Sequence, residues 1–177
     1  DIEIALSHKF SNPQVLGEAL THRSYSVEHD LAYDNQRLEF LGDAVLEIIL
    51  TEYLYKKYPS VAEGQLTKMR AALVQQESLA VLARDISIGD HLRMGKGEME
   101  AAGNRRESTL SDAFEAVLGA LFLDAGLEKA RGFVLPLVQL HFPDPERLLL
   151  ETNPKGALQE LTQKKFNAGP AYAIVEV

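Results

Sequence analysis

Four carboxylates stand in two pairs within the most apolar parts of the sequence. Glu39 and Asp43 are four residues apart in "RLEFLGDAVLEIIL". Asp112 and Glu115 are three residues apart in "SDAFEAVLGAL". Both spacings place the members of a pair on one face of a helix, and neither pair has a Lys or Arg at helical spacing. An unpaired charge among buried apolar residues is costly, so these acids require a cation from elsewhere.

A site for a hard divalent cation is the chemistry that this set of residues fits. Mg²⁺ prefers oxygen ligands and is commonly held by carboxylates, water and substrate phosphate, and Mn²⁺ accepts the same ligands. The alternative is that the acids lie on solvated faces or pair with distant arginines. Two matched pairs favour the metal site over that alternative.

The two apolar segments that carry the acids also carry a glycine each, Gly42 and Gly119. A glycine inside a helix costs about 1 kcal/mol relative to alanine, so two of them need a structural reason. Close approach of the two helix backbones is the simplest reason. We therefore expect the two helices to cross near the acidic pairs.

The composition restricts the class of protein. The chain has 177 residues, 46% of them hydrophobic, and contains no cysteine, which excludes a disulfide framework and a thiolate metal site. The net charge of −8 argues against a general electrostatic grip on nucleic acid, so a polyanion would need local basic clusters or bound metal. There is no apolar run of membrane-spanning length and no signal-peptide pattern, so we expect a cytoplasmic protein without a membrane partner.

Apolar periodicity and helix-capping residues predict an all-α domain over residues 1–150. Ser11 or Asn12 is expected to cap the first helix, and Ser60 and Glu63 have capping-box spacing. Residues 95–107 are Gly-rich and charged, which predicts an exposed loop, and the prolines after Phe142 predict a linker. Residues 151–177 then comprise the linker and the start of a second, incomplete unit. The helices are expected at about 11–25, 35–57, 60–75, 77–87, 109–126, 127–142 and 154–166, with a strand at 171–177.

Several motifs resemble those of the ribonuclease III family. "NQRLEFLGDAVL" is similar to the family signature, and "RRESTLSDAFEAVLGALFLD" resembles its second conserved block. "ALTHRSY", "EGQLTKMRAALV" and "GKGE" match bacterial members in the expected order. "NPKGALQELTQKKF" with "PAYAIVEV" resembles the opening of a double-stranded RNA-binding domain. The resemblance covers essentially the whole chain.

The resemblance implies a ribonuclease III-type helical endonuclease domain, followed by the first helix and strand of an α/β double-stranded RNA-binding domain. The implied activity is divalent-metal-dependent cleavage of double-stranded RNA to 5′-phosphate and 3′-hydroxyl ends, in RNA processing such as maturation of rRNA precursors. Mg²⁺ is the implied cofactor, and Mn²⁺ would substitute for it. Asp43 and Glu115 match the family's catalytic residues. The implied metal ligands are Glu39, Asp43, Asp112 and Glu115.

Other positions acquire roles only through the resemblance. Glu63 matches a carboxylate that supports the metal through water, although the capping box with Ser60 is an equal alternative. The family forms homodimers in which each subunit cuts one strand, and Phe40 matches a residue that plugs into the partner. The alternative for Phe40 is ordinary core packing.

The RNA-binding residues implied in the second unit are Gln159, Glu160 and Gln163, which match a helix face that reaches an RNA minor groove. Recognition there depends on shape and 2′-hydroxyl groups, so polar side chains suffice. The alternative is that they form the solvated face of an amphipathic helix. His22 is more simply explained as a structural residue than as a metal ligand.

Two other functions compete with the endoribonuclease. One is an RNA-binding protein that holds duplexes without cutting them, and the four intact carboxylates argue against it. The other is a helical metal-dependent phosphohydrolase acting on small nucleotides. The RNA-binding helix and the Gly-rich segment 95–107 favour a long polymer as substrate.

Overall fold

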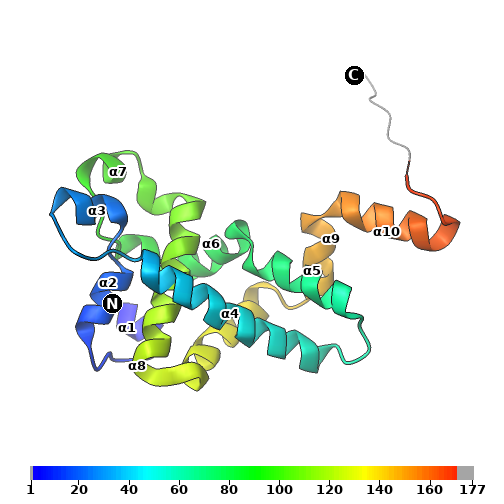
Figure 1. The fold of residues 1–177 in the computed structure, drawn as a ribbon, viewed down its shortest axis with the longest axis horizontal. Coiled ribbons are helices and arrows are strands. Elements are labelled where there is room, and N and C mark those ends of the chain that lie inside the picture. The colour runs from blue at the N-terminus through cyan, green and yellow to red at the C-terminus, as the bar shows by residue number, and fades with distance from the viewer. Residues whose placement is uncertain (1, 171–177) are drawn as a thin grey trace, which may run out of the picture.

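The computed structural model describes residues 2–170, apart from the side chains of residues 157 and 160, and within that range the chain is all-α (Figure 1). The predicted strand 171–177 lies outside the described residues. Within residues 2–170, the only pairing of extended backbone is a single parallel bridge between Thr21 and Arg93. The helices are α1 (Ile2–Ala5), α2 (Pro13–Ala19), α3 (Arg23–Glu28), α4 (Gln36–Lys57), α5 (Glu63–Val74), α6 (Gln76–Asp85), α7 (Lys96–Glu100), α8 (Glu107–His141), α9 (Pro145–Thr152) and α10 (Pro154–Phe166), with 3₁₀ turns η1 (Ile88–Asp90) and η2 (Gly103–Arg105).

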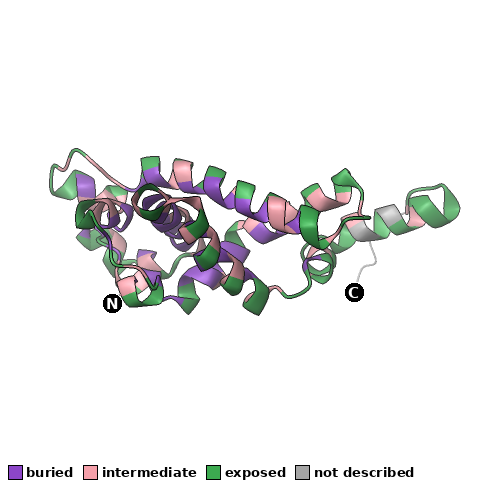
Figure 2. Ribbon diagram, turned by 90° about the horizontal axis from the view of Figure 1, so that it is seen from below, coloured by how far each residue is buried: buried purple, intermediate pink, exposed green. Residues whose placement is uncertain are grey.

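Helices α4 and α8 form the centre of the bundle, and α2, α5 and α6 pack against one or both of them (Figures 1 and 2). Leu46, Ile49 and Leu50 of α4 are fully buried, as are Phe114 and Leu118 of α8. Burial of large apolar side chains from both helices is the main favourable term that holds them together. The crossing of these two helices is therefore the most firmly held part of the molecule.

The two mid-helix glycines lie where α4 and α8 cross. A Cβ atom on Gly42 would overlap the carbonyl oxygen of Glu115, and one on Gly119 would overlap the carbonyl oxygen of Leu38. The predicted close approach of the two backbones is thus confirmed. It also brings the acid-bearing turns of both helices next to each other.

Helix α8 contains the two predicted helices 109–126 and 127–142. Gly126 has φ 80° and ψ 177°, so the helical geometry is interrupted at the predicted place. Glycine adopts a positive φ without the steric cost that a Cβ would impose. Pro136, by contrast, lies within the second half of α8 and does not end it.

Of the predicted helix caps, the one at the start of α2 is confirmed and the one at the start of α5 is wrong. Asn12 does cap α2, because its side chain accepts a hydrogen bond from the backbone N–H of Gln14 at 3.1 Å. The capping box of Ser60 and Glu63 is wrong: α5 begins at Glu63, and Ala62 occupies the N-cap. The Glu63 carboxylate instead accepts a hydrogen bond from the Thr67 hydroxyl at 2.9 Å.

The segment 95–107 is more ordered than the predicted exposed loop, because it contains α7 and η2. The backbone N–H of Gly95 donates to Ser24 Oγ at 2.9 Å, and that of Lys96 donates to Glu28 Oε2 at 2.8 Å. An ion pair between Arg106 and Glu98, at 2.6 Å, closes the segment. These tertiary contacts are invisible to a local reading of glycine and charge.

The predicted linker after Phe142 contains helix α9, which packs against α5. Pro145 and Pro154 stand in the first turns of α9 and α10, where proline is well tolerated, so they mark helix starts rather than an irregular linker. The predicted boundary at residue 150 falls inside α9.

Helix α10 confirms the predicted helix 154–166, and most of its described surface is exposed (Figure 2). No helix within residues 2–170 combines the length and apolar character that a membrane span needs.

Candidate active site

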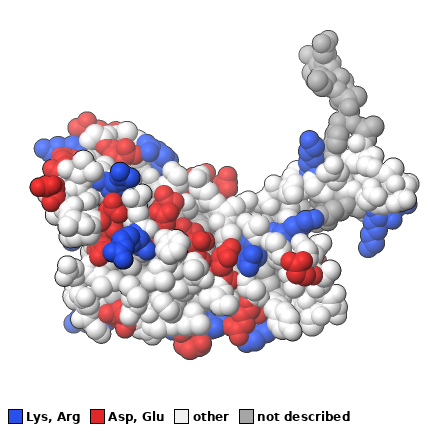
Figure 3. All heavy atoms as spheres, in the orientation of Figure 1, with Lys and Arg blue, Asp and Glu red and all other residues white. Residues whose placement is uncertain are grey.

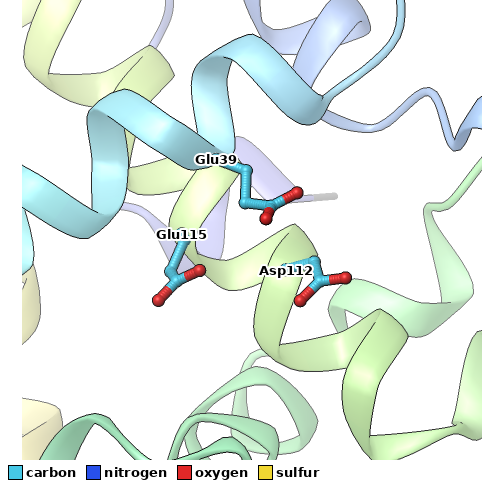
Figure 4. A group of neighbouring side chains, drawn as sticks. All are labelled: Glu39, Asp112 and Glu115. Atoms are coloured by element: carbon cyan, nitrogen blue, oxygen red, sulfur yellow. The ribbon is translucent and has the colours of Figure 1, made fainter.

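Three of the four singled-out carboxylates meet at the crossing of α4 and α8. Glu39 comes from the first turn of α4, and Asp112 and Glu115 come from successive turns of α8 (Figure 4). One carboxylate oxygen from each residue lies within 4.8 Å of the other two. All three side chains are partly buried, so this acidic cluster is accessible from one side while resting on the core.

The electrostatics of the acidic cluster are unfavourable without a cation. Burial, followed by the charges of Asp43, Glu39 and Asp112, raises the pKa of Glu115 to about 8. Burial is also the largest cause that raises the pKa of Glu39 and the pKa of Asp112. Among the described residues, no Lys or Arg counteracts these shifts. The cluster therefore has the donor chemistry of a site for a hard cation.

Asp43 lies at the edge of the acidic cluster rather than in it. It is one turn beyond Glu39 on α4 and is exposed, and its oxygens are not among those grouped within 4.8 Å. Its charge nevertheless contributes to the raised pKa of Glu115 and of Glu39. The structure thus brings three of the predicted ligands together and places the fourth beside them.

Two further acids have different surroundings. Glu47, the next acid along α4, has a cation nearby, because Arg70 Nε lies 3.9 Å from its Oε1. Glu63 lines a depression with Thr51 and Tyr55 at the other end of α4. At 1.5 Å per residue, that end is roughly 20 Å from Glu39. Within one chain, therefore, the structure does not support the predicted water-mediated role of Glu63 at the cluster.

Phe40 is 80% exposed, which rules out the core-packing alternative in the isolated chain. It begins a stripe of exposed residues on one face of α4, where Ile48 and Tyr55 are also exposed. Positions 40, 44, 48, 51 and 55 fall within about 80° of one another around a helix of 3.6 residues per turn. We call these five residues, Phe40, Ala44, Ile48, Thr51 and Tyr55, the α4 stripe.

The residues predicted to contact RNA lie on α10, remote in sequence from the acidic cluster. Gln159 and Gln163 are exposed, and Gln163 Nε2 donates to Asn167 Oδ1 at 3.2 Å. The side chain of Glu160 lies outside the described part of the chain. His22 has a structural position, because its Nδ1 accepts a hydrogen bond from the Ser24 N–H at 3.2 Å and caps α3.

A depression beside the acidic cluster includes residues that the sequence patterns did not single out. Glu39 and Asp112 line one part of it, and Arg23 and Asn35 line another. Asn35 precedes α4 and would ordinarily be interpreted as a helix cap. Arg23 has no charged neighbour in the sequence to draw attention to it. These side chains come from α3, from the start of α4 and from α8, and only the fold brings them to one depression.

The fold and the acidic cluster define a helical nuclease-like bundle whose two central helices cross at glycines and bring their acids together there. A family model described as ribonuclease-III-like matches residues 12–139. Ribonuclease 3 of Campylobacter concisus is 43% identical over 175 residues, covering 99% of this chain and 77% of the relative. Ribonuclease 3 of Symbiobacterium thermophilum is 47% identical over 171 residues, covering 97% and 72%.

Solved structures agree with these relatives. The nuclease domain of ribonuclease III from Campylobacter jejuni superposes with a TM-score of 0.76 at 43% identity, covering 81% of this chain and 97% of that one. Dicer from Pichia stipitis superposes with a TM-score of 0.58 at 26% identity, covering 94% and 74%. The chain belongs to the ribonuclease III family, and it is an endonuclease of that family.

Proposed function

We propose that this endonuclease cleaves double-stranded RNA in a divalent-metal-dependent reaction that leaves 5′-phosphate and 3′-hydroxyl ends. The observation that carries the proposal is the acidic cluster, in which Glu39, Asp112 and Glu115 bring carboxylate oxygens within 4.8 Å of one another. Family membership supports the choice of an RNA phosphodiester as the bond that is cut. Maturation of rRNA precursors in the cytoplasm is the proposed setting.

Glu39, Asp112 and Glu115 would hold Mg²⁺, or Mn²⁺ in its place. Their all-oxygen donor set and close spacing fit such an ion, and no Lys or Arg among the described residues lowers the pKa of any of the three. Asp43 is exposed, so rotation of its side chain would bring a fourth carboxylate toward the same place at little cost. When bound, a divalent ion lowers the pKa of water and stabilises negative charge on the attacked phosphate.

Glu115 and Asp43 have different roles in the proposed reaction. Glu115 is the most perturbed group, and near neutral pH it retains its proton until a cation displaces it. Release of that proton couples ion binding to pH. Asp43 lies on the solvent side of the acidic cluster, where its carboxylate can accept a hydrogen bond from water beside the substrate strand. We assign Asp43 and Glu115 the catalytic roles.

The functional unit proposed is a homodimer, with one acidic cluster in each subunit and one RNA strand cut by each. The α4 stripe supports this assembly, because Phe40 at 80%, Tyr55 at 71% and Ile48 at 53% exposure are large apolar side chains facing solvent in the isolated chain. A region involved in dimer formation is described for the Campylobacter jejuni nuclease domain. Phe40 is proposed to insert into the partner subunit.

Residues 1–150 are proposed to be the endonuclease domain, and 151–177 the linker and the start of a double-stranded RNA-binding domain. On α10, the proposed minor-groove contacts are Gln159, Glu160 and Gln163. On the face shown in Figure 3, acidic and basic side chains are interspersed, without one continuous basic surface. Such a surface suits recognition of duplex RNA by shape and hydroxyl groups more than by charge alone.

The test is incubation of a long perfect RNA duplex with the protein, in Mg²⁺ and in chelator. The wild-type protein should cut the duplex to short products only with the metal. Glu115→Gln should bind the duplex and lose cleavage by a factor of at least about 100, as expected for loss of a group that stabilises transition-state charge. Glu128→Gln is the matched control, because Glu128 is an exposed glutamate on the same helix.

Equal cleavage by Glu115→Gln and Glu128→Gln would remove the acidic cluster from the reaction. Binding without cleavage in both Mg²⁺ and Mn²⁺ would replace the nuclease by an RNA-holding protein. Hydrolysis of free nucleotides in preference to the duplex would favour the small-substrate phosphohydrolase. End-labelling of the products with and without phosphatase treatment checks the 5′-phosphate.

A further inference from the structure

The side chain of Asn35 is buried at a position where its polar atoms are not used by the protein. Asn35 is only 4% exposed. Its backbone N–H donates to Thr21 O at 2.9 Å, and its carbonyl accepts from Glu39 N–H at 2.9 Å, so the main chain is fixed. The side-chain amide makes no hydrogen bond to any residue in the described range. Its polar atoms keep a small contact with solvent, so the hydrogen bonds that they lack within the described part of the protein are open to water or to a bound molecule.

An asparagine before a helix usually caps it with its side chain, but before α4 another residue accepts the backbone hydrogen bond. Asn35 has helical backbone geometry and makes no side-chain cap to α4. The carboxylate of Asp34 accepts the Gln36 N–H at 3.1 Å instead. The Asn35 amide is therefore left available, and the depression beside the acidic cluster is where its remaining accessible surface lies.

The same depression contains an arginine without an acidic partner. Arg23 is exposed and lines the depression, yet it forms no ion pair with any acid among the described residues, although the chain carries a net charge of −8. Other arginines of the bundle do pair, for example Arg84 with Glu107 and Arg106 with Glu98. A free guanidinium next to an anionic site is suited to a phosphate that enters from solvent.

The depression has a volume of about 500 Å³ and is continuous with the acidic cluster, since Glu39 and Asp112 form part of its wall. That volume is within the range of small-molecule sites and accommodates one nucleotide unit. A neutral amide offers a donor and an acceptor, which matches a ribose 2′-hydroxyl, itself a donor and an acceptor. A guanidinium matches the adjoining phosphate.

We propose that this depression binds the ribose–phosphate unit next to the cleaved phosphodiester, with Asn35 contacting its 2′-hydroxyl and Arg23 its phosphate. This inference rests on the proposed function and extends it, because it assigns the discrimination of RNA from DNA to a residue beside the acidic cluster. Asn35 and Arg23 are then specificity-determining residues. They act on a different part of the substrate from the carboxylates.

The test uses short duplexes with one cleavage site and a single 2′-deoxynucleotide placed in turn at each position around it. Wild-type kcat/KM in Mg²⁺ should fall about five- to tenfold at one position next to the scissile phosphate, the effect of losing one hydrogen bond. Asn35→Ala should be slower by the same factor on the all-RNA duplex. It should lose nothing more when that position is deoxy.

Arg23→Ala, an exposed substitution, tests the phosphate contact independently. It should lower kcat/KM at every deoxy position alike and reduce the slope of log affinity against log salt by about one. Arg147→Ala is the control, since Arg147 pairs with Glu151 on α9, and it should change neither quantity. Thermal melting checks that each variant folds, and Asn35→Ser replaces Asn35→Ala if the latter does not.

The inference is overturned if the asparagine variant keeps the deoxy sensitivity of the wild type, or if Arg23→Ala matches Arg147→Ala in rate and salt slope. Failure of the proposed function gives a different result. In that case the wild-type protein itself would not cut the all-RNA duplex.

Discussion

At the scale of single residues, the acidic cluster makes the metal-free protein less stable than it could be. Glu115 has a pKa of about 8 in the folded chain against 4.5 as its ordinary value. Between these two pH values the folded state binds a proton that the unfolded state has released. Stability therefore falls as the pH rises through this window.

Glu115→Gln should consequently stabilise the metal-free protein, because glutamine carries no charge at any pH. The expected gain is about 1–2 kcal/mol at pH 8.5, after allowance for solvent screening of a partly exposed group, and close to zero at pH 5. Urea midpoints in chelator at the two pH values measure it. Glu128→Gln is the control, and an equal gain for both variants would mean that the acidic cluster is not strained.

Mg²⁺ should stabilise the protein more at higher pH, which is the opposite of the pH trend expected for the metal-free protein. It is expected to raise the melting temperature of the wild-type protein at pH 8, where Glu115 loses its proton readily, and to do so less at pH 6. Glu115→Gln should show a much smaller rise at both pH values. A metal-induced shift in the variant as large as in the wild type would place the ion elsewhere.

Three acids of the site were predictable because helical spacing and missing counter-charges are local properties. Glu39, Asp112 and Glu115 satisfy both criteria, and their helices cross at the predicted glycines. The displacement of Asp43 to the edge depends on how α4 is rotated against α8, which spacing does not specify. The availability of Asn35 depends on Asp34 taking over the cap and on a backbone bond to Thr21.

At the scale of elements, the α4–α8 crossing tolerates no added methyl group. Gly42→Ala should destabilise the protein by about 3 kcal/mol or more and abolish cleavage, because the new Cβ would overlap the Glu115 carbonyl and separate the helices. Gly132→Ala, in an open part of α8, should stabilise it by about 0.5–1 kcal/mol. Chemical denaturation of both variants measures the contrast, and similar effects would contradict the crossing.

The elements that could be predicted are those with strong local signals. The ends of α4, the break at Gly126 and the extent of α10 follow from apolar periodicity, a glycine and a proline start. Helix α9 and the order in segment 95–107 were missed because they depend on tertiary contacts. The first packs on α5, and the second is held by Ser24 and Glu28.

At the scale of the whole molecule, the features of the chain divide between two faces of α4. One face turns Glu39 toward α8 and completes the acidic cluster, while the α4 stripe faces solvent. One subunit can therefore contain the whole acidic cluster and still expose an apolar surface on the other face of α4. This division predicts that assembly and chemistry can be separated by mutation.

Phe40→Asp should dissociate the proposed dimer while leaving the acidic cluster intact. Burying a charge in place of a large apolar anchor should raise the dimer dissociation constant at least about 100-fold. Leu140→Asp is the control, because Leu140 is 69% exposed on α8 and lies outside the α4 stripe. Sedimentation velocity over a concentration series measures the assembly.

Because each subunit is proposed to cut one strand, Phe40→Asp should convert double-strand cuts into single-strand nicks, resolved by comparing native and denaturing gels. Retained dimerisation with unchanged double-strand cuts would exclude the α4 stripe as the interface.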